Sequence, residues 1–130
     1  MTPAREAMQE PLEAIHDYYK AFSTLDMSAI VSCYGEPSMT ITPQGVSSAG
    51  NRATLAGMLA PLVDGLRAKG YGRSEFVQPH VTPLGRTAAI VRGVAVRYTA
   101  GGSEMERVNL SYLMRRDEAG WKIAVLLVEG

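Results

Sequence analysis

Side chains that commonly carry catalysis or bind metals are sparse in this sequence. His16 and His80 are its two histidines and lie 64 positions apart, and Cys33 is its single cysteine. Neither HxxxH nor CxxC spacing occurs, and the glycine patterns of dinucleotide sites, phosphate loops and hydrolase elbows are absent. We expect no built-in metal and no cofactor, with both histidines at the surface and Cys33 buried as a structural thiol.

The remaining side chains that could form a site are aromatic residues and methionines. The sequence has six tyrosines, two phenylalanines, one tryptophan and seven methionines. Such side chains line cavities that bind small apolar molecules, but at helical or strand spacing they also fill an ordinary core. Composition alone leaves both interpretations open.

Length and charge limit the class of protein. A chain of 130 residues has the length of one domain and can bury a core without disulfides. Its 13 basic and 13 acidic residues are interspersed and give a net charge of zero, so neither nucleic acid nor an anionic membrane is an expected partner. No apolar run approaches the ~20 residues of a membrane span, and the first ten residues are unlike a secretory signal. We predict a cytoplasmic protein with a single domain over residues 1–130.

Hydrophobic spacing predicts three helices in the first half of the chain, over residues 5–25, 26–34 and 51–70. Asp26 stands at the start of the second and Asn51 at the start of the third, and either side chain can cap a helix. Pro11 is expected to begin the regular part of the first helix, because proline disrupts a helix interior, and Pro61 is expected to kink or divide the third.

The rest of the pattern predicts strands. A short strand at 38–42 is followed by a loop of small residues. A strand at 73–81 contains Pro79 and is followed by Pro83, which confine it to a sheet edge or end it early. Residues 87–130 read as three long strands joined by short turns at 100–103 and 117–120. A meander of this length forms a curved sheet that the helices must cover.

The two turns predict the register of this meander. They pair Arg97 with Glu106 and Met114 with Ile123. One face is then nearly all apolar and should pack on the helices and line any cavity; it carries Ala89, Val91, Gly93, Ala95, Val108, Leu110, Tyr112, Met114, Ile123, Val125 and Leu127. The other face includes Val94, Val96, Leu113, Leu126 and Val128, a larger apolar patch than a monomer usually exposes. We therefore predict a homodimer through the outer sheet face.

Two stretches near the ends of the chain have a recognisable spacing. One is Tyr18-x-x-Ala21-Phe22-x-x-x-Asp26-x-x-Ala29-Ile30, and the other is Glu118-Ala119-Gly120-Trp121-Lys122-Ile123. Together with the order of elements, they resemble the NTF2-like superfamily, including its SnoaL-like and ketosteroid-isomerase-like branches. The resemblance implies an α+β cone in which a strongly bent antiparallel sheet wraps around about three N-terminal helices and leaves a pocket at its open end. Members of the superfamily are commonly dimers and include isomerases, polyketide cyclases and dehydratases, so the fold does not settle the function.

The resemblance to the isomerase branch implies roles for three positions. That branch uses a tyrosine on the first helix as oxyanion donor, a carboxylate base after the first strand and a protonated acid in the meander. Tyr18 matches the donor, Thr42 occupies the base position and Tyr112 occupies the position of the second acid. A threonine hydroxyl cannot accept a carbon-bound proton at neutral pH, so isomerase chemistry by that mechanism is not expected. Tyr18 and Tyr112 could still polarise a carbonyl, or each could simply pack and bond a backbone carbonyl.

Three hypotheses for function follow. The first is a binding protein whose cone holds a small, largely apolar molecule; its ligand-binding candidates are Tyr18, Tyr34, Met39, Thr42, Met58 and Tyr112. The alternative is a SnoaL-like cyclase or isomerase acting on a carbonyl compound, with Tyr18 and Tyr112 as catalytic donors. Its base is unidentified, because Glu75 or Glu106 would have to turn into the cavity, and Glu106 opposite Arg97 suits an ion pair better. The third is an assembly or regulatory module whose pocket is closed by its own side chains, which a cavity volume would distinguish.

Overall fold

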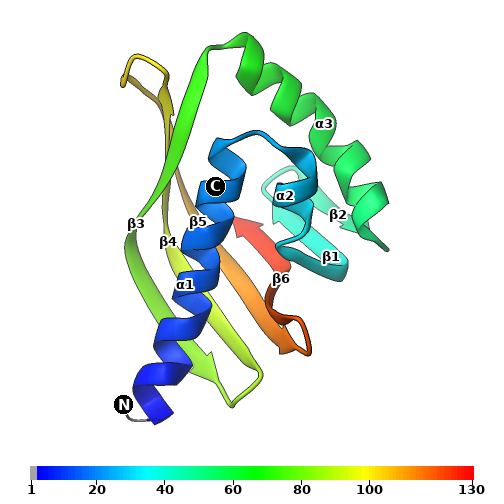
Figure 1. Cartoon of the computed structure of the whole chain (residues 1–130), viewed down its shortest axis with the longest axis vertical. Helices are drawn as coiled ribbons and strands as arrows, with labels where there is room; N and C mark the ends of the chain where they lie inside the picture. The colour runs from blue at the N-terminus through cyan, green and yellow to red at the C-terminus, as the bar shows by residue number, and fades with distance from the viewer. Residues whose placement is uncertain (1–2) are drawn as a thin grey trace.

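The structure is a computed structural model that describes residues 3–130, with the side chains of residue 5 and residues 7–130. Within this range, three helices cover one face of a bent six-stranded sheet, as Figure 1 shows. The helices are α1 (Pro3–Ser23), α2 (Met27–Val31) and α3 (Arg52–Ala68). The strands are β1 (Tyr34–Thr42), β2 (Gly45–Ala49), β3 (Tyr71–Leu84), β4 (Ala88–Thr99), β5 (Glu104–Asp117) and β6 (Gly120–Val128). The predicted α+β class, with a bent sheet around N-terminal helices, is confirmed.

The strands lie in the order β2-β1-β6-β5-β4-β3, and all neighbours run antiparallel except β1 and β6, which are parallel. The predicted meander is confirmed as β4 to β6, and β3 lies at a sheet edge as its prolines predict. The loop expected after β1 is wrong, because residues 45–49 form β2. The turn that ends β1 is tight, with the Gln44 amide donating to the Thr42 hydroxyl oxygen at 3.2 Å, so the chain returns along the free edge of β1.

Two prolines lie inside helices rather than at their boundaries. Pro11 was expected to begin the first helix, but α1 starts at Pro3 and continues through it. The Pro11 side chain is fully buried, and this packing offsets the backbone hydrogen bond that proline cannot donate. Pro61 likewise lies inside α3 without dividing it.

The two predicted caps are confirmed. Asp26 accepts a hydrogen bond from the Ser28 amide at 3.1 Å, and Asn51 accepts one from the Thr54 amide at 2.8 Å. The second helix ends at Val31, earlier than expected, because the chain then enters β1. Across residues 3–130 no helix combines the length and hydrophobicity that a membrane span requires.

A β-bulge interrupts the pairing of β5 with β6. The predicted pair of Met114 and Ile123 is confirmed, but the next residue back along β5, Leu113, pairs with Val125. Ala124 is therefore an extra residue on β6, and beyond it every β6 side chain points to the opposite face from the one that a regular register predicts.

The predicted faces are consequently wrong for the last four strand residues. Val125 and Leu127 were expected on the inner face but lie on the outer one, where Val125 pairs with Leu113. Leu126 and Val128 were expected on the outer face but point inward, since they pair with Tyr112 and Leu110. The bulge exchanges two apolar pairs between the core side and the solvent side of the sheet.

Gly93 on β4 makes room for an aromatic ring of β3. A Cβ atom on Gly93 would lie 2.4 Å from Cζ of Phe76, which means that the ring packs directly on the glycine backbone. The Phe76 ring also contacts the rings of Tyr19 and Tyr112, with centroids 5.2 and 6.0 Å apart. Gly93 therefore fixes the position of a ring that supports two tyrosines of the interior.

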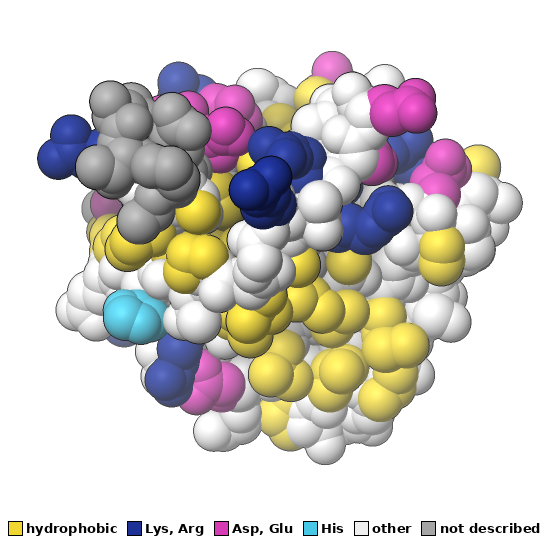
Figure 2. Space-filling model, turned by 90° about the horizontal axis from the view of Figure 1, so that it is seen from below, with side chains coloured by type: hydrophobic (Ala, Val, Ile, Leu, Met, Phe, Trp, Pro, Cys, Tyr) yellow, Lys and Arg dark blue, Asp and Glu magenta, His cyan; other side chains and the backbone are white. Residues whose placement is uncertain are grey.

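The outer sheet face carries an apolar patch that differs from the expected one. Val94 and Val96, which were expected in this patch, are only 9% and 1% exposed. Cross-strand pairs instead align exposed or half-buried residues of β1, β2, β4, β5 and β6. We call these residues the outer patch: Met39, Ile41, Val46, Ile90, Leu113, Val125 and Leu127. Figure 2 shows hydrophobic side chains gathered together on the surface seen from below.

We expect Gly93→Ala to destabilise the fold by roughly 1–3 kcal/mol, because the new methyl group overpacks against Phe76. Urea unfolding measures this loss as a lower midpoint with an unchanged slope. The matched control is Gly101→Ala in the exposed β4–β5 turn, where the nearest atom to a new Cβ is 3.9 Å away. Equal midpoints for the two variants would mean that the Phe76 ring is not held in place.

Candidate functional site

A cavity of about 210 Å³ lies between α1, α3 and the inner face of β4, β5 and β6. Most of its wall is apolar and consists of Phe22, Leu59, Leu62, Ala95, Val108, Leu110, Leu126 and Val128. Its polar residues are Tyr18, Tyr19, Tyr34, Ser74, Arg97, Glu106 and Tyr112. An open volume of this size argues against the hypothesis of a pocket closed by its own side chains.

Four buried tyrosines form two hydroxyl pairs on the cavity wall. The hydroxyl oxygens of Tyr18 and Tyr34 are 2.7 Å apart, and those of Tyr19 and Tyr112 are 2.8 Å apart. The rings also pack edge to face, with the Tyr18 centroid 5.4 Å from that of Tyr34 and 5.9 Å from that of Tyr112. The pairing lets phenols from α1, β1 and β5 share one apolar interior.

Each hydroxyl pair retains one hydrogen for another acceptor. A phenol carries a single O–H, and one hydrogen bond joins the two members of a pair. Whichever tyrosine accepts within the pair therefore still has its own hydrogen to donate. Among the hydrogen bonds of the described residues, no further acceptor takes it, so both pairs can donate to a molecule in the cavity.

Burial raises the pKa of all four phenols. The pKa of Tyr34 rises to about 12, because burial disfavours the phenolate more than the hydrogen bond from Tyr18 favours it. Burial also raises the pKa of Tyr18, Tyr19 and Tyr112. All four hydroxyls stay protonated at neutral pH and act as hydrogen-bond donors.

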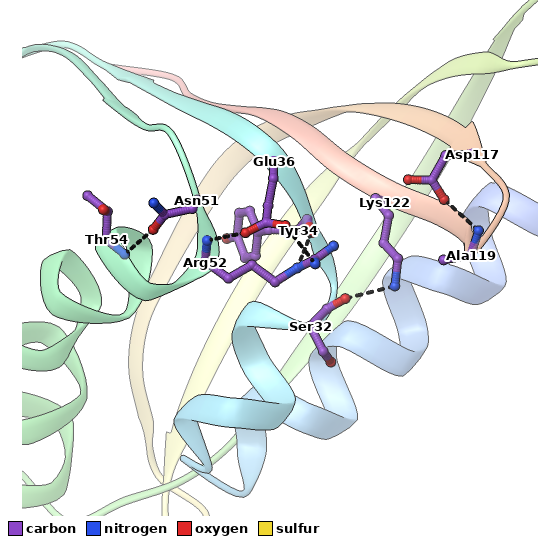
Figure 3. Close-up of polar contacts among 9 residues, drawn as sticks. All are labelled: Ser32, Tyr34, Glu36, Asn51, Arg52, Thr54, Asp117, Ala119 and Lys122. Carbon is purple, nitrogen blue, oxygen red and sulfur yellow. Dashed lines mark hydrogen bonds and ion pairs between the residues drawn. The ribbon is translucent and has the colours of Figure 1, made fainter.

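A charged cluster holds Tyr34 and the start of α3 together, as Figure 3 shows. Arg52 Nε donates to the Tyr34 carbonyl oxygen at 2.9 Å, and Arg52 Nη1 lies 3.2 Å from Glu36 Oε1. The Arg52 amide donates to the other carboxylate oxygen of Glu36 at 2.8 Å. On the far side of β1, Lys122 Nζ donates to the Ser32 carbonyl at 2.8 Å. These contacts hold the backbone that presents the Tyr34 phenol to the cavity.

An ion pair stands at the more exposed end of the cavity. Arg97 Nη1 donates to Glu106 Oε1, and the two side chains are 24% and 45% exposed. The Arg97 guanidinium carbon is 5.5 Å from the centre of the Phe22 ring. The predicted cross-strand pairing of these residues is confirmed, and both also line the cavity.

Three of the six ligand-binding candidates from the sequence line this cavity, namely Tyr18, Tyr34 and Tyr112. The other three are not among its lining residues. Met39 belongs to the outer patch because it pairs with Val125 beyond the bulge. Thr42 is the last residue of β1, and Met58 is 40% exposed on α3, where Leu59 and Leu62 line the cavity instead.

Sequence reasoning missed several lining residues. Tyr19 was not among the candidates from the sequence, although its hydroxyl reaches the Tyr112 hydroxyl across 93 positions of sequence. Leu126 and Val128 were predicted on the outer face, because a regular register does not include the bulge at Ala124. The predicted pairing of Arg97 with Glu106 continues the alternation of the inner face, which is a usable signal for the cavity. Glu106 was considered as a base but judged better suited to an ion pair, and Arg97 was not named as a candidate.

The remaining reactive side chains lie outside the cavity lining. His16 and His80 are exposed, as predicted, and Cys33 is half-buried. The Cys33 thiol points at the Ala29 carbonyl at 3.6 Å, and burial raises the pKa of this thiol. Within the described part of the chain, no three His, Cys, Asp or Glu side chains gather closely enough to hold a metal ion.

Comparison with known proteins agrees with this architecture. Residues 9–130 match the model of a family described as NTF2-like protein (DUF6841), and no curated protein matches the sequence. An NTF2-like protein with a cystatin-like fold from Novosphingobium aromaticivorans has a TM-score of 0.76 at 21% identity, covering 93% of this chain and 79% of that one. A dehydratase candidate of the NTF2-like family from Streptomyces avermitilis has a TM-score of 0.74 at 17% identity, covering 98% and 97%. A protein of unknown function from Nostoc punctiforme has a TM-score of 0.75 at 10% identity, covering 99% and 92%. At these identities the likeness shows the fold alone.

We expect the free energy of unfolding to fall as the pH rises above about 10. Tyrosines of the unfolded chain lose their protons near pH 10, whereas Tyr34 in the folded chain keeps its proton to about 12. Between these two pH values the unfolded chain loses the proton and the folded chain keeps it. The unfolded state is therefore favoured increasingly as the pH rises, and the free energy of unfolding falls. Urea unfolding at pH 8, 10 and 11 measures the effect. Tyr34→Phe should lessen the loss between pH 10 and 11 by on the order of 1 kcal/mol, and an unchanged pH slope in this variant would contradict the assignment.

Proposed function

This chain belongs to the NTF2-like family whose model its residues 9–130 match, and we propose that its cavity binds a small, largely apolar molecule bearing a hydrogen-bond acceptor. One observation carries the proposal. An apolar cavity of about 210 Å³ has two phenol pairs on its wall, and each pair retains a hydroxyl hydrogen. Buried polar groups are normally satisfied, so hydrogens held at such a wall favour an acceptor supplied by a ligand.

The size and lining of the cavity define the ligand. A cavity of roughly 150 Å³ can hold benzene, so this one suits a molecule with one ring and a short substituent. Leucine, valine and phenylalanine side chains supply the apolar contacts, and burial of apolar surface contributes roughly 25 cal/mol per Å². The phenol hydrogens would orient a carbonyl or ether oxygen. We therefore infer a ligand whose affinity is mainly hydrophobic and whose orientation is set by tyrosine.

A reaction of the cyclase or isomerase kind on a carbonyl compound is the second candidate function. Glu106 favours it, because a carboxylate that lines the same cavity as the phenols could serve as the base that a proton transfer needs. The Streptomyces avermitilis relative is itself a dehydratase candidate. Against this function, Arg97 already engages Glu106, and Thr42, at the base position implied by resemblance, does not line the cavity.

We expect cyclohex-3-en-1-one, a one-ring β,γ-unsaturated ketone, to bind the protein without being isomerised. The double variant Tyr18→Phe/Tyr34→Phe removes one hydroxyl pair together, so that no lone buried hydroxyl is left. Its Kd for the ketone should rise roughly 2- to 10-fold, the worth of one hydrogen bond. Isothermal titration calorimetry measures binding, and ultraviolet absorbance of the conjugated ketone reports isomerisation.

The matched control for this experiment is Tyr98→Phe. Tyr98 is a half-buried tyrosine of β4 that does not line the cavity, so removal of its hydroxyl should leave the Kd for the ketone unchanged. Unaltered binding in the double variant would contradict the role of the phenols. Conjugated product formed by the parent protein and lost in Glu106→Gln would establish the second candidate function instead.

We also propose that two copies of the chain pair through the outer patch. Met39, Val125, Leu113 and Ile90 stand side by side across four strands, since each pairs with the next. Exposed fractions of 36–40% for Met39, Ile90, Leu113 and Leu127 leave a contiguous apolar area on one sheet face. A contiguous patch is more often covered than left in water, and a twofold axis would place it against its own copy.

We expect sedimentation at micromolar concentration to give twice the mass of the chain, and Leu113→Glu to give the monomer. The substitution places a charge in the middle of the outer patch, where it would lose its hydration in the pair. Met8→Glu is the control, because Met8 is 46% exposed on α1, away from the outer sheet face. A parent protein that sediments as a monomer would exclude the pairing.

A further inference from the structure

A groove continues outward from the charged end of the cavity. It has a volume of about 290 Å³ and lies along the second half of α3 and the start of β5. The groove and the cavity share Leu62, Arg97 and Glu106 as lining residues. Lys69 lines the groove but not the cavity. Arg97 therefore lies at the boundary between an apolar interior and a charged exit.

We infer that the ligand of this site is a carboxylate with an apolar body. This inference rests on the function proposed above. Its apolar part lies in the cavity and its acid group lies against Arg97. A guanidinium has five N–H donors, and Glu106 takes one of those of Arg97. Among the hydrogen bonds of the described residues, the other donors have no acceptor, so they remain for a second carboxylate in the fork geometry that arginine offers.

The surroundings of Arg97 strengthen such a contact. Its side chain is 24% exposed, and its guanidinium lies 5.5 Å from the centre of the Phe22 ring. A carboxylate bound there is partly withdrawn from water, and charge-assisted hydrogen bonds are stronger in such a place than at an open surface.

The charges of the cavity and groove together also favour an anion. Their charged lining residues are Arg97, Lys69 and Glu106, which sum to one positive charge. One ligand carboxylate neutralises this charge. A cationic ligand would have to take Glu106 from Arg97 and lie near Lys69, and a neutral ligand would leave the excess charge without a partner.

The experiment compares phenylacetate with phenylacetamide, which have the same shape and differ in charge. Calorimetry at pH 7.5 and low salt should give phenylacetate a Kd roughly tenfold lower. In Arg97→Gln the ratio of the two Kd values should fall to about one. In Glu106→Gln, removal of the like charge should lower the Kd for phenylacetate several-fold. Arg107→Gln is the matched control: it removes an exposed arginine of β5 that pairs with Glu104, and the ratio should persist.

Each outcome is decisive. Equal affinity of the parent protein for both compounds overturns the carboxylate inference and leaves the binding function intact. Binding of neither compound overturns the carboxylate inference, and if cyclohex-3-en-1-one does not bind either, the proposed binding function is overturned as well. A preference for phenylacetate that survives in a folded Arg97→Gln variant, as judged by circular dichroism, overturns the assignment to Arg97. The comparison in the parent protein needs no variant, so misfolding of Arg97→Gln cannot rescue the inference.

Discussion

The extra residue at Ala124 is the constraint on which both surfaces of the sheet depend. Because side chains alternate along a strand, a single inserted residue turns Leu126 and Val128 into the cavity and sends Val125 and Leu127 to the outer face. A regular β6 would give the cavity a different wall and the outer patch different members. The pairing of β6 with its parallel neighbour β1 is also irregular in this region, and beyond the irregularity Met39 pairs with Val125 on the outer face.

The phenol pairs solve a problem that the apolar interior creates. A hydroxyl buried without a partner costs on the order of 1–3 kcal/mol, and an apolar wall offers none. Tyr18 with Tyr34, and Tyr19 with Tyr112, supply each other's partner from elements far apart in sequence. In each pair one hydroxyl hydrogen is left without an acceptor among the described residues. These two hydrogens make the tyrosine wall of the cavity polar but add no charge to it.

Local patterns in the sequence were sufficient for the fold but not for the site. Helix caps at Asp26 and Asn51, the edge position of β3 and the pairs across the two meander turns follow from short-range rules and were predicted correctly. The bulge has no such signature, because Ala124 sits in an apolar run where either face is acceptable. Three candidate residues line the cavity, and Met39 illustrates why others do not: its position depends on a parallel pairing with a strand more than eighty residues away.

The cavity wall draws on nearly the whole length of the chain, from Tyr18 on the first helix to Val128 at the end of the last strand. No contiguous piece of the chain contains it, so the site exists only when both ends of the fold are docked together. Occupancy and global folding are therefore thermodynamically linked: a ligand that binds only the folded state adds RT ln(1 + [L]/Kd) to the stability of the whole domain. Thermal denaturation thus becomes a general readout for this protein, able to reveal an unknown ligand before any reaction is known.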